Sequence, residues 1–160
     1  MKKKFLITFV SVLMLVALTF SLAACGSSIT GTYKLEEMRV TSYADGKVYT
    51  AKAGEDIVVE TGTGHDMEYS VQADDCVFTF KKDGTYSISM KLPQIYATSI
   101  NMINASTKGT WEEKNGKIST KADGDDDEVD ISSALTIDDG KIVVDMMAEL
   151  GIKFVLSKQN

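Results

Sequence analysis

The chain has few of the residues from which catalytic and metal sites are usually built. Its 160 residues include one histidine, His65, and two cysteines, Cys25 and Cys76. Nucleophilic catalysis by serine or cysteine usually needs a histidine base, and His65 is the only imidazole that could serve. No Gly-x-Ser-x-Gly elbow is present either, so we expect no enzymatic activity and no cofactor. Because Cys76 is the only cysteine after residue 25, an intramolecular disulfide and a multi-cysteine metal site are excluded from that part.

Positive charge is also scarce. The chain has 17 lysine and arginine residues against 23 aspartate and glutamate residues. Three of the lysines lie at positions 2–4 and no acid precedes Cys25, so the remainder has 14 basic and 23 acidic residues, a net charge of −9. Nucleic-acid binding depends on basic contacts to phosphate, so we expect no nucleic-acid partner. Anionic lipid headgroups would repel this part of the chain as well.

The N-terminal segment begins with a basic stretch that leads into a long uncharged run. Lysines 2–4 precede apolar residues 5–20, and Leu22-Ala23-Ala24-Cys25 follows. That order is the layout of a secretory signal. The four residues ending in Cys25 resemble the lipobox of bacterial lipoproteins, in which the cysteine is diacylated and becomes the mature N-terminus. The resemblance implies a signal peptide over 1–24, a lipidated Cys25 with a short linker over 25–30, and a lipid-anchored cell-membrane protein facing outside the cytoplasm.

Two other interpretations of this leader stay open. Residues 5–24 carry no charge, and a run of about 20 residues is just long enough to span a bilayer core, so an uncleaved anchor is one alternative. An ordinary secreted protein cut after Ala24 is the other. We favour lipidation, because Cys25 stands where a lipobox requires it and the uncharged Gly26-Ser27-Ser28 follows as a flexible connection.

Residues 31–160 are dominated by hairpin signals, which are two turn residues flanked by alternating residues. Four of them occur: Asp45-Gly46, Asp83-Gly84, Asn115-Gly116 and Asp139-Gly140. Two-residue loops predict these facing pairs: Tyr43–Val48 and Thr41–Thr50, Trp111–Thr120, Ile137–Ile142 and Leu135–Val144. At Asp83-Gly84 a two-residue loop would split the apolar face, so we predict a three-residue loop over 82–84 with a left-handed Gly84. Its facing pairs are then Phe80–Tyr86, Phe78–Ile88 and Cys76–Met90.

These hairpins predict an all-β fold, with further strands over 32–40, 57–60 and 152–157. An antiparallel meander of about eight strands must close or stack to hide its edges. We predict closure into an up-and-down barrel over residues 31–160, and a two-sheet sandwich is the alternative. Residues 51–72 stay unassigned, and 95–103 fit either a strand or a short helix.

Short phrases in this region resemble a known group of domains. They are Gly31-Thr32-Tyr33-Lys34-Leu35, Phe80-Lys81-Lys82-Asp83-Gly84-Thr85-Tyr86, Gly109-Thr110-Trp111-Glu112 and Leu135-Thr136-Ile137-Asp138-Asp139-Gly140-Lys141. In this order they resemble the lipocalin-like domains of small lipoproteins from low-GC Gram-positive bacteria. The resemblance implies a barrel with an apolar cavity and names no ligand. True lipocalins carry a tryptophan where this chain has Tyr33, and a late arginine, whereas Arg39 is the only arginine here.

Two sets of residues are candidate sites. The apolar set predicts a ligand pocket with residues 95–103 as its lid, although ordinary core packing explains the same residues: Tyr33, Phe78, Tyr86, Met90 and Trp111. The acidic set, Asp123, Asp125 and Asp127, has the spacing of the first ligands of a calcium loop. Glu128 stands where that loop needs glycine, so we expect a solvated loop, with these residues as weak metal candidates only.

Together these features predict a non-enzymatic, membrane-anchored binding module for a small apolar ligand or lipid-like group. The alternative is a structural or interaction protein that contacts another component of the cell envelope through its acidic outer face.

The lipobox interpretation has a direct test. Replacing Cys25 by alanine removes the only thiol at the cleavage site, so Cys25→Ala should abolish metabolic labelling with a radioactive fatty acid and leave an unprocessed precursor on a gel. Cys76→Ala is the matched control and should label normally. Normal labelling of the Cys25 variant would rule the lipid anchor out.

Overall fold

The computed structural model describes residues 29–60, 66–115, 117–124, 129–130 and 134–160, and these form an all-β protein. The strands are β1 (Gly31–Thr41), β2 (Val48–Lys52), β3 (Asp56–Val59), β4 (Met67–Ser70), β5 (Cys76–Phe80), β6 (Thr85–Ile95), β7 (Ile100–Lys114), β8 (Lys117–Ala122), β9 (Val129–Asp130), β10 (Leu135–Asp138), β11 (Lys141–Met146) and β12 (Ile152–Lys158). One short 3-10 turn, η2 (Ala73–Asp75), precedes β5.

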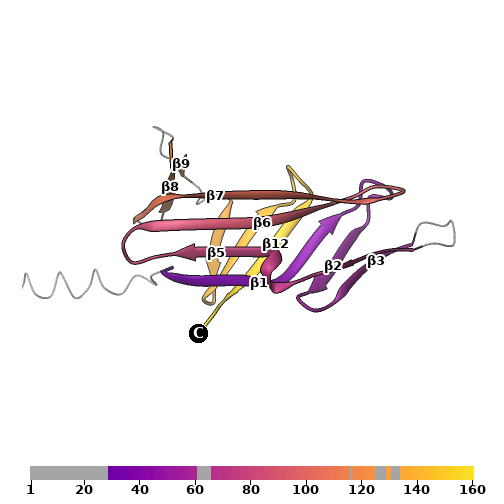
Figure 1. Ribbon diagram of the computed structural model, residues 1–160, viewed down its shortest axis with the longest axis horizontal. Helices are drawn as coiled ribbons and strands as arrows, with labels where there is room; N and C mark the ends of the chain where they lie inside the picture. The colour runs from indigo at the N-terminus through magenta and orange to yellow at the C-terminus, as the bar shows by residue number, and fades with distance from the viewer. Residues whose placement is uncertain (1–28, 61–65, 116, 125–128, 131–133) are drawn as a thin grey trace, which may run out of the picture.

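The main sheet is an antiparallel meander curled into a half-barrel (Figure 1). Its strand order is β10-β11-β12-β1-β5-β6-β7-β8-β9, with β2 also paired to β1, and β3 and β4 form a separate two-stranded sheet. The last strand, β12, therefore pairs with the first, as barrel closure requires.

The predicted closure of the barrel is nevertheless wrong, because the sheet ends at β9 and β10 instead of joining them. Those two strands have two and four residues, so they offer few ladder bonds. The half-barrel therefore stays open at this seam.

Most of the predicted hairpin registers are confirmed. The observed pairs include Phe80–Tyr86, Phe78–Ile88, Cys76–Met90, Trp111–Thr120, Ile137–Ile142 and Leu135–Val144. The three-residue loop is confirmed as well: Gly84 has a φ of 80°, and the N–H of Lys81 donates to the carbonyl of Thr85. Local turn chemistry therefore determines these registers.

The register predicted at Asp45-Gly46 is wrong by two residues. Thr41 faces Val48, and the loop is four residues long, closed by the N–H of Ser42 donating to the carbonyl of Lys47. Ser42 is buried, and Tyr43 leaves the ladder to donate its N–H to the carbonyl of Ile95. Contacts with a distant hairpin therefore override the short turn that the local sequence favours.

Strand β1 has a β-bulge between Leu35 and Glu37, which keeps the same face of the strand toward the core while shifting the buried positions by one residue. Before the bulge Tyr33 and Leu35 are buried, and after it Met38 and Val40 are buried. The extra residue lets the first half of β1 pair with β5 and the second half with β2, while β12 follows its other edge. Core side chains of β1, β5, β11 and β12 pack together on the inner face of the sheet: Met38, Phe80, Ile142, Phe154 and Leu156.

In the two segments that the sequence left undecided, the described residues include strands. Residues 95–103 form the end of a long β6–β7 hairpin in which Ile95 faces Ile100, so the helical alternative is wrong. Because this segment continues the hairpin, it is no separate lid over the inner face. Residues 51–72 contain the end of β2 and the β3–β4 pair, in which Ile57 faces Tyr69.

A close approach of two strands requires glycine at position 109. Strand β7 pairs with β6 along its first part and with β8 only from Gly109 onward (Figure 1). A Cβ at Gly109 would lie 2.0 Å from the carbonyl oxygen of Lys121, which belongs to the backbone and cannot rotate away. Glycine inside a strand often marks such a contact.

Gly109→Ala should therefore separate β7 from β8 and lower the free energy of unfolding by about 3 kcal/mol, the upper range for overpacking a tight site. Urea denaturation followed by the fluorescence of Trp111, which lies on the same pair of strands, measures this loss. Ser106→Ala, on the same strand but exposed, is the control and should stay within about 0.5 kcal/mol of the wild type. Equal stability of the two variants would contradict the close-approach explanation.

Candidate functional site

The inner face of the half-barrel is covered on one side and exposed on the other. On β5, Cys76, Phe78 and Phe80 are all buried. On β6, Tyr86 is buried, whereas Ile88 and Met90 are half-buried, and on β7 the side chain of Ile103 is 44% exposed. Side chains of β11 and β12 pack in the same core as those of β1 and β5, and the inner face becomes more exposed toward β7. We call the open part the inner strip; its residues are Ile88, Met90, Leu92, Ile103 and Ala105.

The inner strip is apolar over two adjacent strands. Met90 faces Ala105 and Leu92 faces Ile103 across the β6–β7 ladder, so their side chains share one face of the sheet. Ile88, Met90 and Leu92 pack against the buried core along one edge of the strip. An exposed apolar surface bordered by a rigid core is typical of a site for an apolar ligand.

The five predicted pocket residues lie on this same inner face but differ in exposure. Tyr33, Phe78 and Tyr86 are 3%, 3% and 5% exposed, so they belong to the packed core. Burial raises the pKa of the Tyr33 hydroxyl. Met90 and Trp111 are half-buried and remain within reach of a ligand. The structure therefore brings the five onto one face and leaves two of them accessible.

Trp111 packs at the β5–β6 turn, beyond the end of the inner strip. Its ring meets Phe80 edge-on with centroids 5.3 Å apart, and its indole N–H donates to the carbonyl of Lys81 at 3.1 Å. The backbone N–H of Trp111 donates to the carbonyl of Gly84. These contacts hold the indole in a fixed orientation, so its fluorescence can report on the nearby inner face.

One buried carboxylate, Asp75, was not predicted from the sequence; it is 1% exposed. It accepts hydrogen bonds from the hydroxyl of Tyr69 at 2.5 Å, the ammonium of Lys91 at 2.8 Å and the backbone N–H of Gln72 at 2.7 Å. These donors come from β4, β6 and the segment before η2, so Asp75 ties the small β3–β4 sheet to the main sheet. In the sequence, Asp75 is an acid in a turn before a strand, and this context gives no signal of such a role.

The charge of Asp75 is stabilised by its partners. Burial by itself would raise the pKa of this carboxyl, but the hydrogen bonds from Lys91, Tyr69 and Gln72 outweigh it and hold the pKa below its usual range. Burial and the same carboxylate raise the pKa of the Tyr69 hydroxyl. All polar partners of Asp75 are used within the fold, so we assign it a structural role.

Cys76 is inert as a nucleophile in the folded chain. Its side chain is fully buried, and burial, together with the neighbouring charge of Asp75, raises the pKa of the thiol to about 12. Since thiolates are the reactive form, Cys76 behaves as a small apolar core residue.

The acidic candidates lie mostly outside the described residues, as do Cys25 and the leader. Asp123 is exposed and pairs at 3.8 Å with Lys108, whereas Asp125 and Asp127 fall outside the described ranges. Within those ranges no group of three histidine, cysteine or acidic side chains is placed to hold a metal ion.

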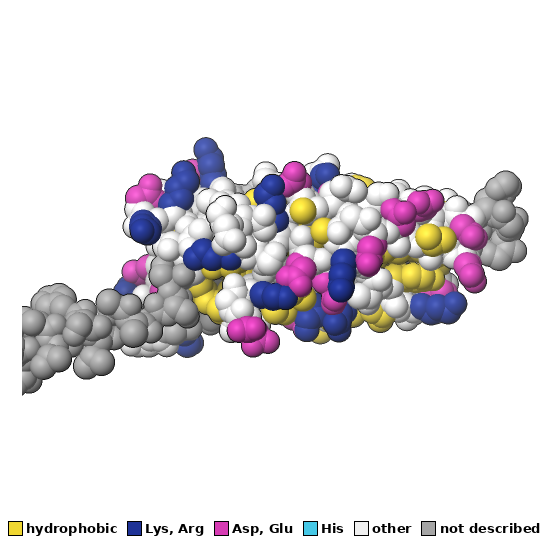
Figure 2. Space-filling view, turned by 90° about the horizontal axis from the view of Figure 1, so that it is seen from below, with side chains coloured by type: hydrophobic (Ala, Val, Ile, Leu, Met, Phe, Trp, Pro, Cys, Tyr) yellow, Lys and Arg dark blue, Asp and Glu magenta, His cyan; other side chains and the backbone are white. Residues whose placement is uncertain are grey.

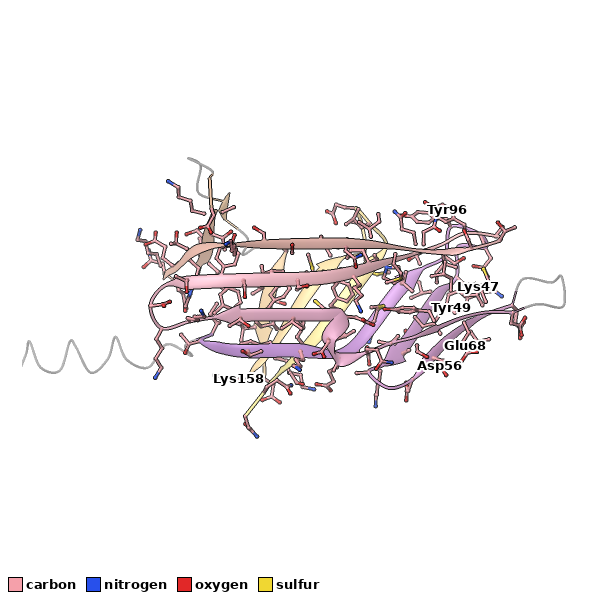
Figure 3. The ribbon with its side chains drawn as sticks, viewed as in Figure 1. Lys47, Tyr49, Asp56, Glu68, Tyr96 and Lys158 are labelled. Atoms are coloured by element: carbon pink, nitrogen blue, oxygen red, sulfur yellow. The ribbon has the colours of Figure 1, made fainter. Side chains whose placement is uncertain are left out.

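Two other surfaces are weaker candidates. A shallow depression of about 400 Å³ over β5–β7 is lined by Val77, Ser87, Ile88, Ser89, Ser106, Thr107 and Lys108. Four of these seven residues carry short hydroxyls, which water can satisfy as well as a ligand would. At the end of the molecule where Figure 3 labels Tyr96 and Tyr49, the exposed rings of Tyr43 and Tyr96 stack with centroids 5.5 Å apart. This contact holds the β1–β2 loop against the β6–β7 turn.

The role of Asp75 predicts a pH-dependent stability. Because its pKa is lowered on folding, its contribution is present above the unfolded value of about 3.9 and is lost as pH falls through the folded value. Asp75→Asn should lower the free energy of unfolding by about 2 kcal/mol at pH 7. The difference from the wild type should shrink as the pH falls from 4 to 2.

The adjacent Asp74→Asn is the matched control, because the side chain of Asp74 is 72% exposed and pairs with Lys34 at the surface. Surface pairs of this kind contribute little, so Asp74→Asn should change stability by less than about 1 kcal/mol at any pH. Denaturant melts at several pH values measure both variants. A pH-independent loss in Asp75→Asn would show that its charge is not what matters.

Comparison with known proteins brings no relative that could assign a function: no family model, curated protein or solved structure matches the chain. Among the described residues, no helix has the length and hydropathy needed to cross a bilayer. The features that bear on function are therefore the geometry of the inner strip and the sequence of the leader.

Proposed function

We propose that the chain is a lipid-anchored, extracytoplasmic binding module of lipocalin-like architecture, without enzymatic activity, that holds a small apolar ligand along its inner strip. The observation that carries the proposal is the change in exposure across the inner face, from buried side chains on β5 to the 44% exposed Ile103 on β7. When a ligand covers such an apolar surface, each Å² removed from water stabilises the complex by about 25 cal/mol.

The composition of the inner strip suits a ligand of variable shape. Met90 lies at its centre between Ile88 and Leu92, and methionine adapts to irregular apolar surfaces better than branched side chains do. No charged side chain faces this part of the β6–β7 ladder between Ile88 and Leu92, since Ser89 and Lys91 point to the outer face. We therefore expect a neutral, apolar group as ligand rather than an ionic one.

The leader supports the anchored location. A diacylated Cys25 would supply two acyl chains, and two are enough for stable membrane attachment. The acidic remainder of the chain contributes no attraction to an anionic membrane surface. An apolar-ligand site held close to a membrane suits a lipid-like molecule as the ligand.

The alternative of an envelope-interaction protein with an acidic docking face has less support. On the face shown in Figure 2, lysine and acidic side chains are interspersed, with hydrophobic side chains between them. Elsewhere in the described residues, charges are also neutralised in pairs between strands, such as Lys141 with Glu36 at 2.7 Å. The mixed charges on the face in Figure 2 offer a partner little electrostatic steering there.

Titration with the apolar dye N-phenyl-1-naphthylamine tests the ligand site. Energy transfer from Trp111, the only tryptophan, should report saturable binding. Met90→Lys places a charge in the inner strip and should weaken binding at least about tenfold, which corresponds to 1.4 kcal/mol.

Ser89→Lys is the matched control, because it adds the same charge one residue away on the outer face. It should bind the dye like the wild type. Equal losses in both variants, or dye binding that does not saturate in the wild type, would contradict a ligand site on the inner strip.

A further inference from the structure

Among the described residues, the edge of β7 facing away from β6 has no partner strand over residues 100–108. Strand β6 pairs with residues 100–110 of β7, and β8 takes up the other edge only from Gly109 onward. Apart from the N–H of Asp123, which donates to the carbonyl of Lys108, no described backbone group bonds to this edge before Gly109. In Figure 1 this part of β7 runs along the border of the front layer, without a neighbouring strand beyond it.

The alternation of ladder bonds identifies the backbone groups that are free. At the hairpin turn the N–H of Tyr96 donates to the carbonyl of Ser99, which makes this a hydrogen-bonded pair. Bonded and non-bonded pairs alternate along an antiparallel ladder. Odd-numbered residues of β7 therefore bond to β6, and the N–H and C=O groups of its even-numbered residues point outward. On the unpaired part these are Ile100, Met102, Asn104 and Ser106.

This edge lacks the devices that normally keep an edge strand from pairing. Natural edges are protected by lysines, prolines, bulges or short length. Residues 92–107 contain no charged side chain, and the unpaired part of β7 contains no proline. Pro93 is on β6, where it faces Met102 across the ladder. The free edge is thus long, regular and uncharged, within a chain of net charge −6.

We propose that this edge binds the same edge of a second copy of the chain, through antiparallel β7–β7 pairing about a two-fold axis at Ile103. The axis places Ile103 opposite its own symmetry mate in a non-bonded pair, where side chains approach most closely. Met102 then faces Asn104 of the partner copy, and Ile100 faces Ser106. All four outward-pointing residues find a hydrogen-bonding partner in this register.

Charge and exposure favour a second copy as the occupant. Two acidic molecules repel each other over most of their surfaces, and residues 92–107 are an uncharged stretch through which they can meet. The contact also removes from water the 44% exposed Ile103, a large aliphatic side chain on the unpaired part of β7. An isologous interface needs a self-complementary surface, and antiparallel pairing of one edge with itself supplies it.

Cysteine cross-linking of the full chain in membranes of expressing cells tests the register. In Ile103→Cys the two new cysteines would face each other with their Cα atoms about 4.5 Å apart, which is within the range that a disulfide spans. Copper–phenanthroline should convert it to a covalent dimer at least about fivefold more than Thr98→Cys, which places a thiol in the exposed hairpin turn. The buried Cys76 should not react, so the wild type should stay monomeric on the gel.

A charge-pair experiment checks the same contact without a thiol. Two differently tagged copies carrying Ile103→Lys should not co-purify, whereas a copy with Ile103→Lys and one with Ile103→Glu should, because opposite charges would then face each other. Thr98→Lys should leave co-purification unchanged. The proposal would be overturned if Met102→Cys or Asn104→Cys cross-linked more than Ile103→Cys, or if Thr98→Cys cross-linked as much as Ile103→Cys. So would recovery of the Lys–Lys pair.

Discussion

Pairing of β1 with three other strands is the constraint on which the rest of the fold depends. Its first residues pair with β5, its later residues pair with β2, and β12 follows its opposite edge throughout. The bulge between Leu35 and Glu37 makes this sharing possible, since it turns the strand while keeping its apolar residues toward the core. Without β1, the N-terminal hairpins and the C-terminal hairpin would have no common core.

The open seam and the exposed inner strip have one origin. Strands β10–β12 join the sheet through β1, but β9 and β10 are too short to complete the circle. The inner face of β6 and β7 therefore stays uncovered. The free edge of β7 has another cause, since β8 has only six residues and pairs with β7 from Gly109 onward.

Much of this fold could be predicted from the sequence, because its hairpins depend on local turn chemistry. Gly84 in the left-handed region determines the Phe80–Tyr86 pairing, and Asp139 and Gly140, both with positive φ, determine the β10–β11 pairing. The Asp45-Gly46 turn could not be predicted in this way, since the burial of Ser42 and the contact of Tyr43 with Ile95 come from tertiary packing.

The candidate site was predictable in part. Period-two alternation placed Phe78, Tyr86 and Met90 on one face, and the pairing confirms that they share it. Alternation does not show which residues on that face are buried, because their burial depends on strands that are distant in the sequence. Asp75 was not predicted for a related reason. Its partners Tyr69 and Lys91 lie on different strands, and no spacing in the sequence indicates that the three side chains meet.

With the proposed lipid on Cys25, the buried Ile29 just before β1 would determine how the molecule stands on a membrane. Only four peptide steps separate it from Cys25, a reach of at most about 14 Å. Two copies joined by antiparallel edges have a dyad perpendicular to the sheet, so anchors in the same bilayer require that dyad to follow the membrane normal. The long strands would then lie along the lipid surface, and both inner strips would open in the same direction, toward or away from the headgroups.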